Sequence, residues 1–338
     1  MKIVVDVFGG DYAPDEILKG CADALKIEKD VELALFGGAE TINKKLAALN
    51  VDMKRVGVFD ASDIITNDDI PTDAIKNKKD SSLVRALEYL KNDGDAKAVI
   101  SSGNTGAFLA GGLFKVGRIK GVSRPALAPV LPNAKGGFTM LIDCGANVDC
   151  KPLFLCHFAL MGSAYMQSVY GLESPRVALL SNGTEDKKGN ELNRTVFPLL
   201  KKLPINFVGN MEARDALSGE YDVLVSDGFA GNIALKSTEG AVNFLFKALK
   251  GAMNKSLKTK LGAVLLKKEL YKMKKELDYT ELGGAPFLGV EKILIKNHGS
   301  AKANTVAASI TQAKRLAEKD IVGAIKKRLE GVEIETSE

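Results

Sequence analysis

The sequence predicts an α/β fold in which a mostly parallel β-sheet is covered by helices. Short apolar runs rich in β-branched residues recur along the chain, and most of them alternate with stretches of helical periodicity. The loops that follow these runs are rich in Gly, Asp and Asn, and in such folds ligands bind beyond the carboxyl ends of the strands. At 338 residues the chain is long enough for one large α/β domain, 1–338, built as a single body or as two intertwined halves.

Seven runs have the length and the apolar character of buried strands. They are KIVVDVF at 2–8, VELALFG at 31–37, KAVISS at 97–102, FTMLIDCG at 138–145, RVALLSNG at 176–183, INFVGN at 205–210 and DVLVSDG at 222–228. Residues 239–280 differ, because helix formers with lysine on most turns run through them without a convincing strand. We expect a helical hairpin there, bending near Gly251 or Gly262.

Composition and cysteine spacing narrow the class of protein. The chain is 46% hydrophobic and 26% charged, and no apolar run reaches the about 18 residues that a membrane-spanning helix requires. The amino terminus lacks the pattern of a secretory signal, so we expect a cytoplasmic protein. Cys144, Cys150 and Cys156 are spaced more widely than the ligands of most structural zinc sites, which favours reduced, mostly buried thiols.

The segment SSGNTGA at 101–107 connects an expected strand to an expected helix through a glycine turn. Unpaired N–H groups at the start of a helix attract anions, and Ser101, Ser102, Asn104 and Thr105 add more polar side chains than a turn needs. We interpret the segment as an anion site, with a ligand-free tight turn as the alternative. The chain contains neither G-x-G-x-x-G nor a P-loop, which disfavours the common nucleotide sites.

The remaining candidates each have a structural and a functional interpretation. His157 lies within an apolar segment and is expected to be a core histidine, whereas His298 follows an apolar strand and either reaches a site or caps the next helix. In LLSNGTEDKKGNE at 179–191 a polar loop offers Thr184, Lys187 and Lys188 beside a strand end, where a lysine can neutralise an anion or simply remain in solvent. Turn and cap roles are favoured over divalent-ion binding for the three strand-end aspartates, Asp6, Asp143 and Asp227.

Eight motifs occur along nearly the whole chain. They are VDVFGGDYAP at 5–14, SSGNTGA at 101–107, VGRIKGVSRPALAP at 116–129, DCGANVDCKP at 143–152, NGTEDKKGNE at 182–191, GNMEARD at 209–215, DGFAGNIALK at 227–236 and HGSA at 298–301. In this order they resemble the bacterial phosphate acyltransferases, which make acyl phosphate from acyl-carrier protein for phospholipid synthesis. Phe8, Ser102, Cys144 and Ala301 depart from residues usual in that family, and valine at the position of Cys144 argues against a nucleophilic role.

The resemblance implies a three-layer α/β/α sandwich similar to isocitrate and isopropylmalate dehydrogenases and to phosphotransacetylase, with a protruding helical hairpin. It also implies a homodimer that works without cofactor, metal or nucleic acid. The implied reaction is attack of inorganic phosphate on the thioester carbonyl of acyl-acyl-carrier protein, which feeds phosphatidic acid synthesis. Two alternatives stay open: a phosphotransacylase that uses acyl-CoA, and a non-catalytic membrane scaffold.

The same resemblance implies site residues. From the K-K-G and D-G-F-x-G-N motifs, Lys187 and Asn232 are expected to neutralise phosphate and hold the thioester carbonyl. Arg124 is a candidate because guanidinium binds phosphate in bidentate fashion, although it could instead serve a structural ion pair. The expected phosphate and substrate residues are Ser102, Gly103, Asn104, Thr105, Gly106, Arg124 and His298.

The expected hairpin is strongly basic, since 247–278 holds ten lysines against three acidic residues. A basic amphipathic segment suits an anionic membrane surface or an acidic partner such as acyl-carrier protein, and packing in a dimer is the alternative use of its apolar side. We therefore expect a cytoplasmic protein that associates peripherally with the membrane. The resemblance implies in addition the homodimer and, as a partner, a membrane glycerol-3-phosphate acyltransferase. The expected membrane contacts are Leu257, Leu261, Val264 and Leu265.

Overall fold

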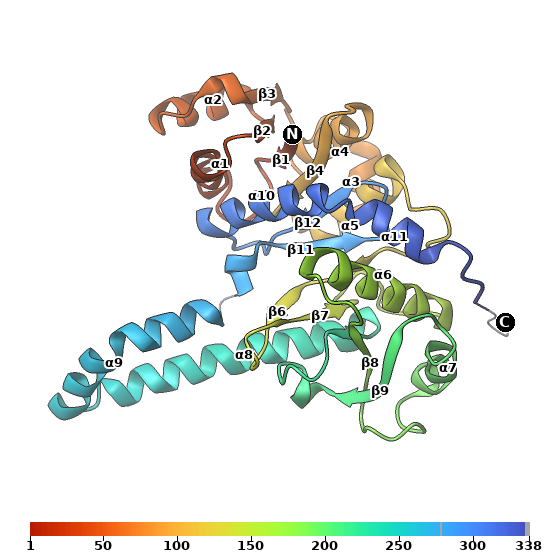
Figure 1. Cartoon of the computed structure of the whole chain (residues 1–338). Helices are drawn as coiled ribbons and strands as arrows, with labels where there is room; N and C mark the ends of the chain where they lie inside the picture. Colours follow the sequence, from red (N-terminus) through yellow and green to blue (C-terminus); the bar gives the residue numbers. More distant parts are fainter. Residues whose placement is uncertain (278, 335–338) are drawn as a thin grey trace.

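The structure is a computed structural model that describes residues 1–277 and 279–334. Residue 278, which falls in the expected hairpin range 239–280, lies outside the described residues, as do 335–338 at the end of the expected domain. The described strands form one seven-stranded and one five-stranded sheet, and helices flank both (Figure 1).

The first sheet has the order β3-β2-β1-β4-β12-β11-β5. The run from β3 to β12 is parallel, whereas β11 pairs antiparallel with both of its neighbours. The chain leaves this sheet after β5 and returns to it only for the last two strands. The bounds are β1 Lys2–Asp6, β2 Glu32–Gly37, β3 Val56–Asp60, β4 Ala96–Ser101, β5 Ala126–Leu127, β11 Ala285–Leu288 and β12 Ile293–Lys296.

The second sheet has the order β6-β7-β10-β8-β9 and is parallel apart from β6 at its edge. Its strands come from one continuous stretch of chain, because the segment between β5 and β11 builds all of it. The bounds are β6 Val130–Pro132, β7 Phe138–Ile142, β8 Arg176–Ser181, β9 Asn206–Glu212 and β10 Val223–Val225.

All seven runs that were expected as strands form strands, and the parallel-dominated α/β architecture is confirmed. The expectation of one sheet was wrong, because local periodicity reports burial and not the strand with which a segment pairs. β3, β5, β6 and β11 were not expected. β3 is an edge strand with the sequence VGVFD that is only partly buried, so it lacks the strongly apolar character of the interior strands.

Helices cover both faces of the first sheet because its strands are apolar on both sides. Ile3 and Val5 of β1 belong to the core formed with α1 and α10, whereas Val4 points into the core formed with α4 and α5. The helix bounds in this half are α1 Asp15–Ile27, α2 Ala39–Ala48, α3 Pro71–Asn77, α4 Ser82–Asn92, α5 Thr105–Gly111, which runs on as a π-helical turn to Val116, and α10 Ala303–Glu318.

The second sheet is covered in the same way. Its inner face packs on α6, Pro152–Tyr170, and α7, Glu191–Leu200, in the same core that holds α1 and α10, so one apolar cluster joins the two halves. Its other face packs on the first turns of α8, where Leu235 lies with Leu141 and Leu224. The C-terminal helix α11, Ile321–Leu329, packs against α6.

Two long helices project from the second sheet (Figure 1). α8 spans Gly228–Met253, beginning before the expected boundary at 239, and α9 spans Leu257–Glu276, so the bend lies at 254–256. The bend is close to Gly251, whereas Gly262 lies inside α9 and is wrong as a bend position. Among the described residues no helix is long and apolar enough to cross a membrane.

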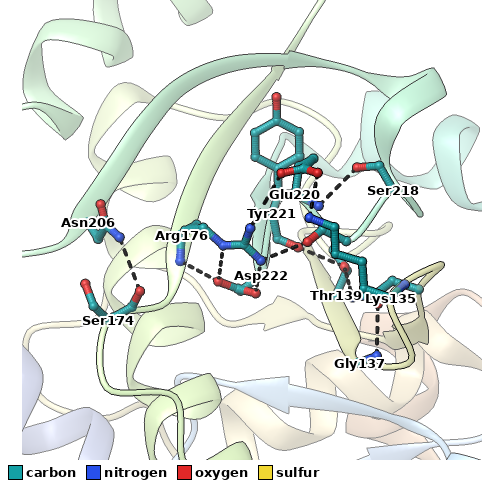
Figure 2. Close-up of polar contacts among 12 residues, drawn as sticks. Lys135, Gly137, Thr139, Ser174, Arg176, Asn206, Ser218, Glu220, Tyr221 and Asp222 are labelled. Carbon is teal, nitrogen blue, oxygen red and sulfur yellow. Dashed lines mark hydrogen bonds and ion pairs between the residues drawn. The ribbon is translucent and has the colours of Figure 1, made fainter.

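Polar contacts at the amino ends of β8 and β10 tie three segments together (Figure 2). Arg176 donates from Nε and Nη2 to the two carboxylate oxygens of Asp222, at 2.9 and 2.8 Å, and from Nη2 to the Gly219 carbonyl at 2.9 Å. Lys135 pairs with the neighbouring Glu220 at 2.6 Å. This network holds the edge of the second sheet that is opposite the carboxyl ends of its strands.

Candidate active site

Three loops of the first sheet meet where β1, β4 and β12 end. The backbone N–H of Asp11, after β1, donates to the carbonyl of Gly299, after β12, at 2.8 Å. A Cβ on Gly9 would lie 2.7 Å from the backbone nitrogen of Gly103, after β4, so only glycine permits this approach of two turns. The strand ends therefore form one continuous polar rim, as expected for a ligand site in an α/β fold.

A cavity of about 520 Å³ lies between this rim and the first turns of α8. From the first half it is lined by Asp11, Gly103, Thr105, Lys296, Asn297 and His298, and from the second half by Cys144, Gly145, Asn232, Lys236 and Glu239. The two halves thus enclose it together, with polar and charged side chains on both walls.

Asp6 forms the base of the rim and is buried. Its two carboxylate oxygens accept hydrogen bonds from the hydroxyls of Ser82 and Ser101, both at 2.6 Å. Burial raises the pKa of Asp6, while the two hydroxyls and the nearby ammonium of Lys296 oppose that rise. Asp6 therefore has a structural role beneath the loops, consistent with the turn role favoured from sequence.

Lys296 is the last residue of β12 and is only 7% exposed. Burial lowers its pKa to about 8, against the influence of Asp6 and Asp11. The sequence-based candidates did not include it, although it ends the run ILIK, in which every other residue is apolar and buried. A lysine at the end of such a strand was the signal that could have identified it.

Asn232 and Lys236 reach the cavity from α8. They are four residues apart and so lie on one face of the helix. The Asn232 amide lies against the glycine turn after β7, since a Cβ on Gly145 would be 3.8 Å from its Cγ. Lys236 donates to Glu239 at 2.8 Å, and it was also missed, although it ends the motif that supplied Asn232.

The turn SSGNTGA contributes less to the cavity than the sequence predicted. Gly103 and Thr105 line it, but the Asn104 side chain caps α5, accepting from Ala107 N at 3.0 Å and donating to Thr66 O at 3.0 Å. Gly106 packs against Pro71, which a Cβ would approach to 2.6 Å. Ser102 is buried, and its hydroxyl has no hydrogen-bond partner among the described residues.

The two histidines differ as expected. His157 is buried in α6 and its Nδ1 accepts from the Ser123 backbone N–H at 3.3 Å, which confirms a core histidine. His298 lines the cavity, and its Nδ1 lies 2.8 Å from the Ser300 hydroxyl and accepts from the Ser300 N–H. Burial and the charge of Lys236 lower the pKa of His298, so the ring is neutral at pH 7.

The other two strand-end aspartates organise backbone. Asp143 accepts from the N–H groups of Leu127, Ala146 and Asn147 and from the Asn147 amide, and Asp227 caps α8 by accepting from Ala230 N at 2.7 Å. These contacts confirm the turn and cap interpretation. Within the described ranges, no group of three or more His, Cys, Asp or Glu side chains could hold a metal ion.

Lys187 and Arg124 do not line the cavity that contains Asn232. Lys187 is exposed on the loop between β8 and α7, near a second, largely apolar groove of about 800 Å³ that is bordered by Asn182, Gly189 and Asn190 of that loop. The guanidinium of Arg124 lies over the Phe154 ring, 6.0 Å from its centroid.

The cysteine thiols are free. Cys144 lines the cavity but is buried, and burial together with the charge of Asp143 raises its pKa well above the ordinary value. The thiolate, and not the thiol, is the nucleophile, so this cysteine is unsuited to attack an acyl group. The buried, reduced thiols predicted from spacing are confirmed, with Cys150 only partly buried.

Solved structures share the fold. A phosphotransacetylase from Streptococcus pyogenes superposes with a TM-score of 0.61 at 16% identity, over 94% of each chain. A branched-chain phosphotransacylase from Enterococcus faecalis V583 gives a TM-score of 0.57 at 16% identity, over 93% of this chain and 98% of that one. At this identity the likeness concerns the fold alone.

Sequence comparison is more specific. The family model described as "Fatty acid synthesis protein" matches residues 1–323. The phosphate acyltransferase of Clostridium novyi (strain NT) is 47% identical over 330 residues, which cover 98% of this chain and 99% of the relative. The phosphate acyltransferase of Thermoanaerobacter pseudethanolicus is 44% identical over 337 residues and the full length of both. The chain therefore belongs to the phosphate acyltransferase family.

Proposed function

We propose that this chain transfers the acyl group of an acyl-carrier-protein thioester to inorganic phosphate, giving acyl phosphate and free carrier protein for phospholipid synthesis. Family membership supports the acyl transfer to phosphate. The observation that supports placing the reaction at this site is the cavity between the two halves, where Lys236, Lys296 and the Asn232 amide can hold an anion and the lining thiol of Cys144 is unsuited to attack. Such a site suits a reaction whose nucleophile is itself a substrate.

In this reaction a phosphate oxygen attacks the thioester carbonyl carbon, the carbon–sulfur bond breaks, and the thiolate leaves and takes up a proton. The difficulty is electrostatic, because an anion approaches a carbonyl that is becoming an oxyanion. We assign the Asn232 amide to the carbonyl oxygen, since it stands at the turn after β7. The cavity lysines neutralise the phosphate, and no metal, nucleotide or other cofactor takes part.

We also propose Lys187 as a cation for this reaction, on the strength of its motif alone. Because it lies outside the cavity that contains Asn232, either the loop must move or a second copy of the chain must supply it. Arg124 is proposed only as a secondary phosphate contact, since its guanidinium lies over Phe154. Ser102, Asn104, Gly106 and His298 remain proposed as supporting residues, the first three by shaping the turn around Gly103 and Thr105.

We propose that the α8–α9 hairpin serves both a homodimer and a peripheral contact with the cytoplasmic membrane surface, where a membrane glycerol-3-phosphate acyltransferase would receive the product. Leu257, Leu261, Val264 and Leu265 are between 67% and 86% exposed, and lysines flank them. Transfer of such exposed apolar side chains into a lipid interface is favourable, and the lysines favour anionic headgroups.

For the fold as a whole, we propose a three-layer α/β/α arrangement similar to that of the dehydrogenases.

The test is the consumption of acyl-carrier-protein thioester by the purified chain, with and without inorganic phosphate. We expect turnover only with phosphate, and acyl phosphate as the product, trapped as a hydroxamate. Faster turnover of acyl-CoA than of the carrier-protein thioester would favour the phosphotransacylase alternative. Thioester that persists with phosphate would leave the non-catalytic scaffold as the better account.

A further inference from the structure

Asp6, Ser101 and Lys296 form a row across three neighbouring strand ends. Lys296 of β12 pairs in register with Ser101 of β4, and Asp6 ends β1 on the other side of β4. The Ser101 hydroxyl donates to Asp6 at 2.6 Å, so the middle residue of the row is hydrogen-bonded to the buried carboxyl group. Lys296 therefore lies at the cavity. The buried carboxyl group of Asp6 is close enough to oppose the lowering of the Lys296 pKa by burial.

The Lys296 ammonium has unused capacity to donate hydrogen bonds. It carries three N–H groups, and the described residues provide one acceptor for them, the backbone carbonyl of Asn297. The Asp6 oxygens are already engaged by Ser82 and Ser101. A buried cation with open donors faces a cavity that an anion can enter.

Asn297 provides a second donor at the same place. It is 1% exposed and lines the cavity. Its Oδ1 accepts a hydrogen bond from the Ser309 hydroxyl at 2.6 Å, so its amide nitrogen points to the other side. Among the described residues this nitrogen has no hydrogen-bond partner. A buried amide N–H₂ without an acceptor is costly, and its cost is recovered when a ligand oxygen accepts from it.

We propose, on the basis of the function proposed above, that Lys296 and Asn297 form the phosphate-binding floor of the cavity, with Lys296 as the residue that holds the anion for attack. Lys236 lies toward the opposite wall and already pairs with Glu239, so it assists and does not replace Lys296. The thioester carbonyl then approaches from the side of Asn232. Phosphate is then held between the two halves of the molecule, and the acyl donor reaches the phosphate from the half that contains the second sheet.

The titration of Lys296 provides an independent measurement. An ammonium is needed to hold the anion, and burial lowers the pKa of this ammonium to about 8 in the free chain. As pH rises through this value Lys296 loses its charge, so kcat/KM for phosphate falls on the alkaline side. The other charged or titratable groups near it are Asp6 and Asp11 from the first half, Cys144, Tyr170, Lys236 and Glu239 from the second, and His298 on its own loop.

The experiment compares Lys296→Met with Lys292→Met, which removes a second lysine next to the same strand. Lys292 precedes β12 at the opposite end, where its ammonium donates to the Ala96 carbonyl at 3.0 Å. We expect Lys296→Met to lower kcat/KM for phosphate by roughly 100- to 1,000-fold, mainly through KM for phosphate. It should also abolish the rise in Tm that inorganic phosphate produces. Lys296→Arg should retain part of both, and Lys292→Met should leave both unchanged.

Each outcome separates this inference from the proposed function. Wild-type protein without phosphate-dependent turnover refutes the function, whereas wild-type turnover with an unchanged phosphate KM in Lys296→Met overturns the inference alone. If Lys296→Met does not fold, the wild-type pH profile decides. A decrease in kcat/KM for phosphate above about pH 8 that is absent in folded Lys296→Arg supports the inference, and a wild-type profile that stays flat overturns it.

Discussion

The position of Asn232 on α8 determines its proposed role as a hydrogen-bond donor to the thioester carbonyl. It lies in the second turn of α8, faces the glycine turn at Gly145 and lines the cavity. We predict that Asn232→Ala folds normally but forms acyl phosphate roughly 100- to 1,000-fold more slowly, because a preorganised donor for the carbonyl oxygen is lost. Steady-state rates with saturating phosphate measure the effect.

Asn243→Ala is the matched control for that prediction. Asn243 lies on the same helix, is exposed and does not line the cavity. Its replacement removes the same chemical group from α8 at similar cost to the helix. Equal rates for the two variants would show that Asn232 has no part in the reaction.

At the scale of elements, the second sheet depends on the contacts of Arg176 (Figure 2). Its bidentate pair with Asp222 links β8 to the segment before β10, and Asp222 is nearly buried. We predict that Arg176→Ala lowers the free energy of unfolding by about 2 kcal/mol, because hydrogen bonds to a charged partner are lost. Urea denaturation measures this from the shift in midpoint.

Arg214→Ala provides the comparison. The Arg214 side chain is 75% exposed and pairs with Glu212 at 2.6 Å, so its removal should cost less than about 1 kcal/mol. A similar loss of stability in both variants would contradict the special role of the Arg176–Asp222 pair. Neither residue lines the cavity that contains Asn232, and the quantity compared is the free energy of unfolding.

The α8–α9 hairpin carries the second prediction at this scale. Replacement of Leu261 by Glu should weaken binding to phosphatidylglycerol vesicles by roughly tenfold or more, since inserting one leucine is worth about 1.5–3 kcal/mol. Cosedimentation measures the binding, and soluble turnover should not change. Ile27→Glu is the control, because Ile27 on α1 is 67% exposed, as is Leu261. Loss of vesicle binding in both variants would show that the added charge alone is responsible.

At the scale of the whole molecule, the separation of Lys187 from Asn232 raises the question of a shared site. If a second copy supplies Lys187, a mixture of Lys187→Ala and Asn232→Ala chains regains activity that neither has alone. Equal random mixing in a two-fold dimer should restore about a quarter of wild-type sites. Coexpression followed by the phosphate-dependent assay measures this, and a mixture as inactive as its components would leave loop movement as the route for Lys187.

Much of this protein was determined by sequence alone, because the informative features are local or follow chain order. Apolar runs of strand length, glycine turns after them and the caps Asp143 and Asp227 can each be recognised within a few residues. The ordered motifs from VDVFGGDYAP to HGSA identified the family, as full-length relatives show. Asn104 was recognised in its turn, although its side chain proved to be a helix cap.

Only the tertiary structure decided which of these pieces meet. β12 returns to the first sheet beside β4 after the chain has built the whole second sheet, and this pairing puts Lys296 next to Ser101, within electrostatic reach of Asp6. The same folding leaves Lys187 outside the cavity that Asn232 lines. Burial and charge at these positions arise from contacts between segments far apart in the chain, and local periodicity carries no information about such contacts.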